Sequence, residues 1–330
     1  MLKKIQQYIK DNWKFIVFLV VFYLVMNYEL PYVIYTPGGA INMSERVTGD
    51  NTYDESGSLS MTYVSMVKGS LPFLALSYVI PNWDIVSSKD ISYDGDLKTT
   101  VEIDKIYMKE AISNAESVAY DKAEIEYSIK NTKNIVTYVD SNAKTKMHYG
   151  DEILEIDGNE LHSLKELQDY VKEKNAGDIV KITYDRNGKK ITEDTELIRL
   201  NDEAKVGISL ALVSEYRTPY NIEVKTKSGE SGPSGGLITA LEIYNQITEK
   251  DITNGKKIMG TGTIDKDGTV GEIGGVKYKL IGAVKKGAEV FICPEENYEE
   301  ARKVKEENKY NITILSAHTF DEAIEKLNSI

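Results

Sequence analysis

The chain has 330 residues, which is enough for two or three domains with proper hydrophobic cores. Its formal net charge of −12 argues against a protein that tracks nucleic-acid phosphates, so we expect no nucleic-acid partner. The single cysteine, Cys293, excludes an internal disulfide framework and lies in an apolar run, where we expect a buried structural role. The three histidines lack the spacing of metal ligands, so we expect no metal site.

The first 35 residues combine a basic segment with an apolar run. Residues 15–26 are uncharged and apolar, but this run is shorter than the ~20 residues of a usual membrane-spanning helix, and a signal peptide is the competing interpretation. No small residue suited to cleavage follows until Gly38, and Trp13 and Tyr28 bracket the run as interfacial aromatic residues. We therefore predict an uncleaved single-pass membrane anchor within residues 1–35. Its basic residues place the N-terminus in the cytoplasm and the remainder of the chain outside; they are Lys3, Lys4, Lys10 and Lys14.

Residues 36–124 carry turn and strand signals but no motif with a chemical meaning. Tyr35-Thr-Pro-Gly-Gly39 is typical of a turn, and residues 58–67 form a run of β-type residues. Apolar residues recur at helical spacing across 101–123. We predict a β-rich connector followed by a helix.

The segment Gly150-Asp-Glu-Ile-Leu-Glu-Ile-Asp-Gly158 predicts a strand that ends in a tight turn. An amphipathic helix with Leu164, Leu167 and Val171 follows, and then two strands around the turn 186–189. This pattern resembles a PDZ domain over residues 125–204, which implies capture of an extended peptide by strand addition. The usual apolar carboxylate-binding loop is not evident in residues 127–134, and a purely structural spacer is an equal alternative.

Ser234 stands among glycines in Ser231-Gly-Pro-Ser-Gly-Gly236, directly before an apolar run typical of a helix. A serine there exposes its hydroxyl, and the backbone N–H groups at a helix start can bind negative charge. A serine alcohol needs a base to become a nucleophile, and a partly buried neutral lysine can be that base. Gly-Pro-Ser-Gly is also ordinary turn chemistry, so the loop by itself leaves both interpretations open.

Further segments follow the serine loop in a defined order: Thr261-Gly-Thr-Ile264, the glycine-rich residues 268–275, Lys279 and residues 291–297. Together with the loop, this set resembles the proteolytic domain of the Lon protease family, whose members are Ser-Lys dyad peptidases, over about residues 205–330. The resemblance implies that Ser234 is the nucleophile, that Lys279 is the base and that Thr261 holds the lysine. No role in the chemistry is assigned to the nearby polar residues Thr263 and Glu272.

The same resemblance assigns the shape of the loop and its oxyanion site to Gly232, Pro233 and Gly235. At position 235 most relatives carry alanine, and we expect the glycine to add backbone freedom without disturbing the dyad. Helical periodicity does not choose between Lys277 and Lys279, because side chains two positions apart diverge by roughly 200°. The choice of Lys279 rests on the resemblance, and Lys277 is expected to be a solvated surface charge.

As a whole the chain resembles the membrane-anchored PDZ–Lon proteases of bacteria. The expected fold is α+β, with an anchor (1–35), a connector and helix (36–124), a PDZ-like domain (125–204) and a Lon-type protease domain (205–330). The resemblance implies a serine endopeptidase that processes extracytoplasmic peptides or membrane and envelope proteins. Neither a nucleotide nor another cofactor is expected, because the sequence has no Gly-x4-Gly-Lys-[Ser/Thr] phosphate loop. An oligomer is compatible with this interpretation.

Two alternatives belong to other classes. One is a non-catalytic membrane scaffold that uses PDZ-like and protease-like folds only to bind partners; the presence of Ser234, Thr261 and Lys279 together argues against it. The other is a signal-peptidase-like Ser-Lys enzyme, in which the serine lies soon after the anchor. Ser234 lies far downstream of the predicted anchor, which argues against this class.

Overall fold

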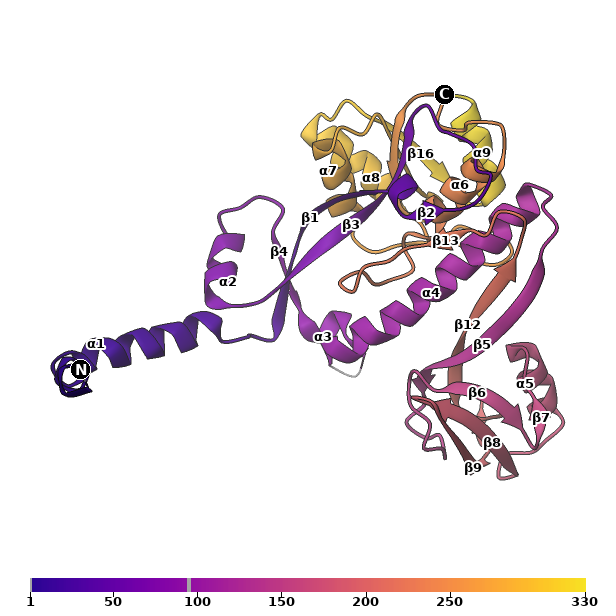
Figure 1. Ribbon diagram of the computed structural model, residues 1–330, viewed down its shortest axis with the longest axis horizontal. Helices are drawn as coiled ribbons and strands as arrows, with labels where there is room; N and C mark the ends of the chain where they lie inside the picture. The colour runs from indigo at the N-terminus through magenta and orange to yellow at the C-terminus, as the bar shows by residue number, and fades with distance from the viewer. Residues whose placement is uncertain (1, 94–95) are drawn as a thin grey trace.

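The computed structural model describes residues 2–93 and 96–330. It contains a larger α+β domain, a smaller domain of residues 128–217 and an N-terminal helix that projects away from both (Figure 1). The smaller domain is inserted between the helices α4 (Leu97–Lys122) and α6 (Gly236–Ile247) of the larger one.

The larger domain is built on a six-stranded sheet of order β16-β15-β14-β3-β1-β4. Three strands come from the C-terminal third and run parallel: β14 (Lys257–Gly260), β15 (Val290–Pro294) and β16 (Thr313–Ala317). The others come from the segment that we expected to be a connector: β1 (Tyr32–Asn42), β3 (Ser58–Lys68) and β4 (Asp84–Ser87). β3 pairs parallel with β14 and antiparallel with β1, so this segment is part of the same sheet as β14–β16.

Helices cover both faces of this sheet, because its central strands alternate buried side chains between two cores. Ile292 packs in a core with α4, α6 and α9 (Phe320–Asn328). Phe291 and Cys293 pack on the opposite face with α7 (Val276–Lys285) and α8 (Glu295–Asn308). The continuous apolar run 290–293 is therefore a strand buried on both faces, which confirms the structural role expected for Cys293.

Short elements complete the larger domain. They are the 3-10 helix η1 (Met43–Glu45), the strand pair β2 (Val47–Thr48) and β13 (Glu223–Val224), and the helices α2 (Leu71–Ser77) and α3 (Ser88–Ile91).

The smaller domain contains a sheet of order β12-β5-β6-β8-β9 and one helix, α5 (Leu164–Lys172). The helix is N-capped by the Ser163 hydroxyl, which accepts from Glu166 N–H at 3.2 Å. Asn187 and Gly188 both have positive φ, as the predicted hairpin turn between β8 and β9 requires. The strands are β5 (Ser128–Val139), β6 (Glu152–Ile156), β7 (Asn159–Glu160), β8 (Ile179–Arg186), β9 (Lys189–Glu196) and β12 (Ile208–Arg217), with a small β10 (Ile198–Leu200) and β11 (Glu203–Lys205) pair between β9 and β12.

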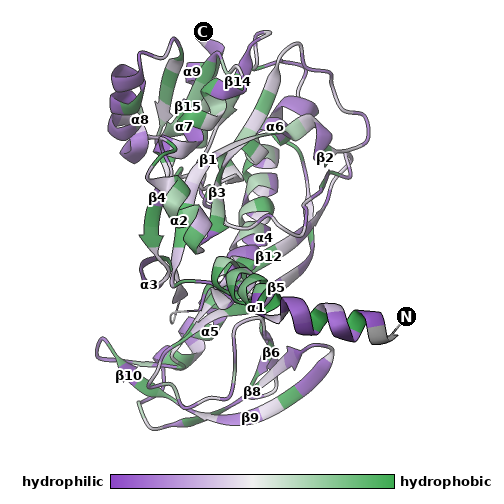
Figure 2. Ribbon diagram, turned by 90° about the vertical axis from the view of Figure 1, so that its left-hand side faces the viewer, coloured by the Kyte–Doolittle hydropathy of each residue, from purple (hydrophilic) through white to green (hydrophobic). Residues whose placement is uncertain are grey.

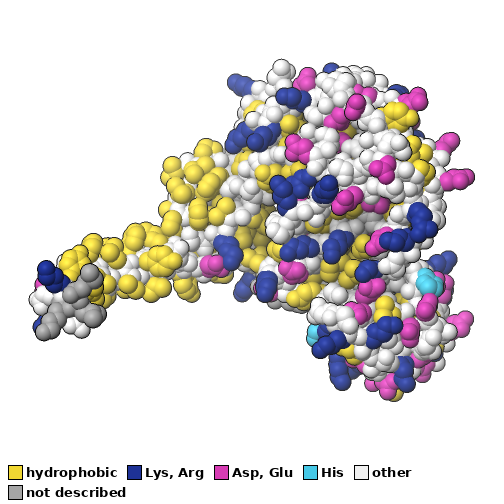
Figure 3. Space-filling model, viewed as in Figure 1, with side chains coloured by type: hydrophobic (Ala, Val, Ile, Leu, Met, Phe, Trp, Pro, Cys, Tyr) yellow, Lys and Arg dark blue, Asp and Glu magenta, His cyan; other side chains and the backbone are white. Residues whose placement is uncertain are grey.

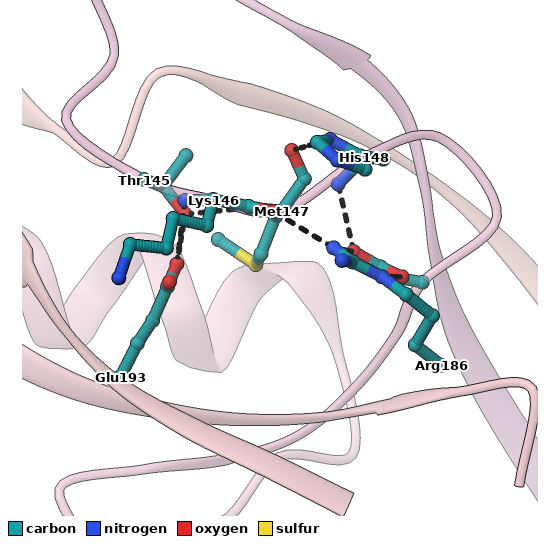
Figure 4. Close-up of polar contacts among 7 residues, drawn as sticks. Thr145, Lys146, Met147, His148, Arg186 and Glu193 are labelled. Carbon is teal, nitrogen blue, oxygen red and sulfur yellow. Dashed lines mark hydrogen bonds and ion pairs between the residues drawn. The ribbon is translucent and has the colours of Figure 1, made fainter. Parts of the chain in front are cut away.

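The Gly-Asp signature of this domain has a structural role. The Asp151 carboxylate is buried and accepts two 2.7 Å hydrogen bonds from the guanidinium of Arg186 on β8. It also accepts from His148 N–H at 2.7 Å, while Arg186 donates to the Lys146 carbonyl at 2.7 Å (Figure 4). On the other side of the same loop, Glu193 accepts from Lys146 N–H at 2.9 Å. These bonds hold the loop before β6 in one conformation.

The edge strand β12 of the smaller domain is covered by α4. Leu212 N–H donates to the Glu110 carboxylate at 2.8 Å, and Ser214 N–H donates to the Ser113 hydroxyl at 2.9 Å. Residues 127–134, where the sequence shows no apolar carboxylate-binding loop, form mostly the strand β5, which pairs with β12. In Figure 1 α4 lies between the two domains along this edge.

The predicted membrane anchor is not supported. A helix does form in the expected place, α1 (Leu2–Asn27), and its apolar residues are exposed along most of its length (Figure 3). However, among the helices of residues 2–93 and 96–330, none is both long and apolar enough to cross a membrane. Charged residues in the first half of α1 confine the apolar stretch to residues 15–26. Figure 2 shows hydrophilic colour in the part of this helix toward the N-terminus.

Candidate active site

Ser234 lies in the loop that leads into α6, as its glycine-rich surroundings predicted. Gly232 has φ +95°, a conformation that suits glycine, and its N–H donates to the carbonyl of Asp104 on α4 at 3.0 Å. The Ser234 carbonyl accepts from Gly262 N–H at 2.8 Å and from the Thr261 hydroxyl at 2.9 Å. The loop is therefore fixed from two sides, which leaves the Ser234 side chain to face α7.

Lys279 reaches Ser234 from the first turns of α7. The helix starts after Gly275, which has φ +71°. Lys279 is only 3% exposed, and its Nζ lies 2.8 Å from Ser234 Oγ and 2.9 Å from Thr261 Oγ1. Desolvation by burial lowers the pKa of Lys279 to about 7. A substantial fraction of this amine is thus neutral near pH 7 and able to accept a proton.

The hydrogen bonds of Thr261 determine how the amine is oriented. Thr261 is fully buried just after β14, and its N–H donates to the Ile292 carbonyl at 3.0 Å. Its single hydroxyl proton goes to the Ser234 carbonyl, so Thr261 Oγ1 is left to accept from Lys279. With an N–H directed at Thr261, the lone pair of a neutral amine is available to the Ser234 hydroxyl.

The structure separates the two lysines of α7. Lys277 lies away from Ser234, and its Nζ forms an ion pair with Asp84 on β4 at 2.7 Å. The Tyr278 hydroxyl donates to the same carboxylate at 2.6 Å. Lys277 is therefore a partly buried, paired residue rather than the solvated charge that we expected. Asp84 was missed because nothing in its local sequence connects it to α7.

The remaining loop residues, Gly232, Pro233 and Gly235, lie beside Ser234, although the freedom expected of Gly235 is not used. Its φ of −95° and ψ of −4° are open to any residue. A Cβ atom at this position would instead lie 1.9 Å from Sδ of Met61 on β3. Glycine is favoured at position 235 because Met61 leaves no room for a side chain, and not because of the backbone torsion angles.

A cleft of about 510 Å³ opens beside Ser234. One wall is the loop 224–236, and the other consists of β3 and α4, with residues 61–66 of β3 exposed to the cleft. β14 stops opposite Met61, so no strand of the described residues pairs with β3 beyond this point on its cleft side. Ser58 N–H faces β14, and the alternation of a strand places the N–H and C=O groups of Val64 and Met66 on that same side.

The site offers acid–base and nucleophilic groups. No set of three or more His, Cys, Asp or Glu side chains in the described part of the chain is arranged to hold a metal ion. The chemistry available to Ser234 is that of a hydroxyl next to a buried amine.

Comparisons with known families place two regions of the chain. Residues 216–329 match the Lon protease (S16) C-terminal proteolytic domain, and residues 121–197 match the PDZ domain. The chain thus combines a Lon-type proteolytic region with a PDZ region, and the first indicates a serine peptidase. The match to the proteolytic domain begins after β1, β3 and α4, the elements that form the other wall of the cleft.

Individual Lon proteases agree with the assignment of the proteolytic region. The chain is 30% identical over 134 residues to a Lon protease of Campylobacter jejuni, which covers 38% of this chain and 17% of the relative. It is 27% identical over 119 residues to Lon protease 1 of Bacillus subtilis, which covers 35% and 15%. The PDZ domain of an SdrC-like protein from Listeria monocytogenes is 34% identical, covering 23% of this chain and 85% of that one, with a TM-score of 0.23. The chain therefore spans a fifth or less of the length of these Lon proteases.

Proposed function

We propose that the protein is an ATP-independent serine endopeptidase with a Ser234–Lys279 dyad. The observation that carries the proposal is the 2.8 Å contact between Ser234 Oγ and a buried Lys279 amine whose pKa is lowered to about 7. Thr261 supports the dyad as a positioning residue through its contact with the same amine. A non-catalytic scaffold has no need for a desolvated lysine beside a serine, because burying an amine costs stability.

The proposed reaction proceeds through an acyl-enzyme. Ser234 Oγ attacks the peptide carbonyl carbon while its proton passes to Lys279 Nζ. The resulting ammonium group then donates that proton to the leaving amine, and the C–N bond breaks. A water molecule attacks the ester carbonyl with Lys279 again as the base, which releases the second product and restores the Ser234 hydroxyl.

The start of α6 is the proposed site for the negative charge that develops on the carbonyl oxygen. Pro233 has no N–H, but the N–H groups of Ser234 and Gly235 lie in the first turn before the helix. Donors placed in this way commonly contribute about 3 kcal/mol each to stabilising a tetrahedral intermediate.

We further propose that the substrate is an extended, unfolded segment that lies along the free edge of β3. The backbone groups of Val64 and Met66 face the cleft there, and an added strand would pair with them. An extended segment is also the form in which a peptide bond can enter a cleft of about 510 Å³. The edge strand β12 of the PDZ-like domain differs from this edge of β3. Its backbone N–H groups already donate hydrogen bonds to Glu110 and Ser113 of α4.

The test is cleavage of an unfolded casein by the purified full chain, with and without ATP. We expect equal rates in both conditions, no cleavage by Ser234→Ala, and near-normal cleavage by Ser231→Ala, a matched control three residues earlier in the loop. Cleavage by Ser234→Ala would refute the assigned nucleophile, and a strict requirement for ATP would refute energy independence.

A further inference from the structure

The cleft beside Ser234 carries positive charge on the loop that forms one of its walls. Of the residues that line the cleft, four are charged: Arg46, Lys225, Lys227 and Glu230. Three of these are positive, whereas the chain as a whole has a formal net charge of −12. A peptide that enters the cleft therefore meets a local electrostatic field that differs from the field of the whole protein.

The one carboxylate among these residues is paired within the wall. One oxygen of Glu230 accepts from Arg46 at 2.6 Å, and the side chains of Arg46 and Glu230 are only 12% and 22% exposed. The other oxygen accepts from Lys227 N–H at 2.8 Å, and Glu230 N–H donates to the Lys227 carbonyl at 3.0 Å. Because Glu230 and Arg46 neutralise each other, the charges left for a substrate are those of Lys225 and Lys227.

The backbone that carries the two lysines is held at both ends. Directly before Lys225, β13 pairs with β2. Lys225 N–H donates to the Arg46 carbonyl at 2.8 Å, and the Arg46 guanidinium donates to the Lys225 carbonyl at 3.2 Å. After the lysines, Gly232 N–H donates to the Asp104 carbonyl at 3.0 Å. The lysine side chains thus project from a fixed backbone, which lowers the entropy that is lost when they bind a partner.

The lysine side chains themselves have no carboxylate partner in the described part of the chain. Both are exposed, and both line the cleft. A single exposed lysine is usually a solvated surface charge with little energetic effect. Two such lysines on one wall of a cleft, in a chain of net negative charge, are instead placed to meet a carboxylate on the molecule that enters the cleft.

We propose that Lys225 and Lys227 select peptides that carry aspartate or glutamate side chains near the cleaved bond. The inference rests on the proposed peptidase function and adds the class of substrate. An extended segment on the edge of β3 lies opposite the loop 224–236, so its side chains pass the two ammonium groups. The lysines do not touch the reacting atoms, so the selection should be seen in KM, with kcat unchanged.

The experiment uses peptides that share one core, taken from a cleavage site mapped in the casein test. Two residues on one side of the bond, or two on the other, are Asp, Asn or Lys, and both peptide ends are blocked. Each exposed ion pair commonly contributes a factor of about 2 to 5, so kcat/KM of the full chain should be roughly 4- to 25-fold higher for Asp than for Asn. Lys peptides should be cut most slowly.

Substitution of the two lysines should remove this preference. In Lys225→Gln/Lys227→Gln the Asp/Asn ratio should fall to about 1 or below, because the net negative charge of the chain remains. Lys225→Glu/Lys227→Glu should reverse the preference, so that Lys peptides are cut faster than Asp peptides. Ratios between two peptides measured with one enzyme sample do not depend on the folded fraction, so partial misfolding of a variant does not obscure the result.

The matched control lies outside the cleft and away from β3. Lys189 and Lys190 are exposed on β9, at the edge of the smaller sheet opposite to β12. Lys189→Gln/Lys190→Gln removes the same two charges, so both double variants change the formal net charge from −12 to −14. The control should keep the Asp/Asn ratio of wild type. For wild type the ratio should also shrink to less than about twofold in 0.5 M salt, where the screening length is roughly 4 Å.

Each remaining outcome contradicts a separate part of the inference. If peptides are cut but Asp and Asn peptides are equivalent for wild type, the selection is wrong and the peptidase function stands. If the Lys189→Gln/Lys190→Gln control loses the preference equally, the preference reports net charge and the assignment to Lys225 and Lys227 is wrong. A preference that appears only for peptides with a free C-terminus would mean that the lysines bind a terminal carboxylate and not acidic side chains. If wild type cuts no peptide, the proposed function fails as well.

Discussion

The two walls of the cleft are built by different means. The wall formed by the loop 224–236, which we call the polar wall, carries Ser234, and hydrogen bonds connect Ser234 to the buried residues Thr261 and Lys279. The wall formed by β3 and α4, which we call the apolar wall, lines the cleft mainly with apolar side chains, among them Met61, Met108 and Ile112. The residues connected by these hydrogen bonds can tolerate almost no substitution without loss of the reaction, whereas the apolar wall can change its side chains and alter only which peptide is held. The polar wall therefore determines the reaction, and the apolar wall, together with Lys225 and Lys227, determines which peptide is bound.

The largest effect expected on the polar wall comes from Lys279. Lys279→Ala removes the base, and Lys279→Arg replaces it with a guanidinium that does not release a proton at working pH. Both should lower kcat/KM by roughly 10⁴-fold or more, since members of a catalytic unit are not replaceable singly. The measurement is initial-rate cleavage of an unstructured peptide.

The control for this prediction is the neighbouring lysine. Lys277→Ala removes only a partly exposed ion pair with Asp84, so activity should stay within about fivefold of wild type. An inactive Lys277→Ala together with an active Lys279→Ala would reverse the assignment of the base and leave a Ser-Lys mechanism in place.

Substitution of Thr261 should have an intermediate effect on kcat, which is measured as a function of pH. The Lys279 pKa of about 7 means that the neutral, active amine is lost as pH falls through 7, so activity should rise with pH to a plateau above about 8. Thr261→Val removes the oxygen that accepts from Lys279 and should lower the plateau by about 10- to 100-fold in kcat with little change in KM.

Thr261→Ser keeps the hydroxyl and should keep both the plateau and the position of the pH limb. A purely structural role for Thr261 would instead lower the amount of folded protein and leave kcat per active site, counted by serine labelling, unchanged. An activity limb near pH 10 would show that Lys279 is not desolvated.

The smallest effect expected is on the apolar wall, through the contact of α4 with β12. Glu110→Ala together with Ser113→Ala leaves Leu212 N–H and Ser214 N–H without their partners, which should lower the free energy of unfolding by about 1–2 kcal/mol. KM for a peptide should rise a few-fold as α4 loosens, while reaction with a small serine-directed probe should not change.

Glu102→Ala is the matched control on the same helix, because Glu102 is exposed and pairs only at the surface with Lys105. It should alter the free energy of unfolding by no more than about 0.5 kcal/mol in urea titrations. Equal stability of the double variant and wild type would mean that β12 does not hold this wall.

The polar wall is also the part that the sequence predicted best. Its glycines indicated a loop before a helix, because turn conformations depend on neighbours in sequence, whereas the roles of Ser234 and Lys279 came from the resemblance to the Lon family. Ser234 and Lys279 were singled out on motif order, and the structure places their side chains in contact. Their catalytic roles remain a proposal that the substitutions above test.

The apolar wall escaped prediction for a physical reason. Residues 58–67 are β-type residues, but the alternation of their side chains does not predict which strand lies beside them. The pairing of Ser58–Met61 with Lys257–Gly260 and the contact of Met61 with Gly235 join segments far apart in the chain. The expected anchor is not supported, because no helix of the described residues is both long and apolar enough to span a membrane.

The parallel pairing of β3 with β14 also orders events during biosynthesis. β3 can pair with β1 early, and the smaller domain closes its sheet within residues 128–217, but the second edge of β3 has no partner until residues 257–260 emerge. Pairing across so long a separation is slow and comes late in folding. Ser234 therefore meets Lys279 only after nearly the whole chain is made, so a partly synthesised chain carries its nucleophile without the base that activates it.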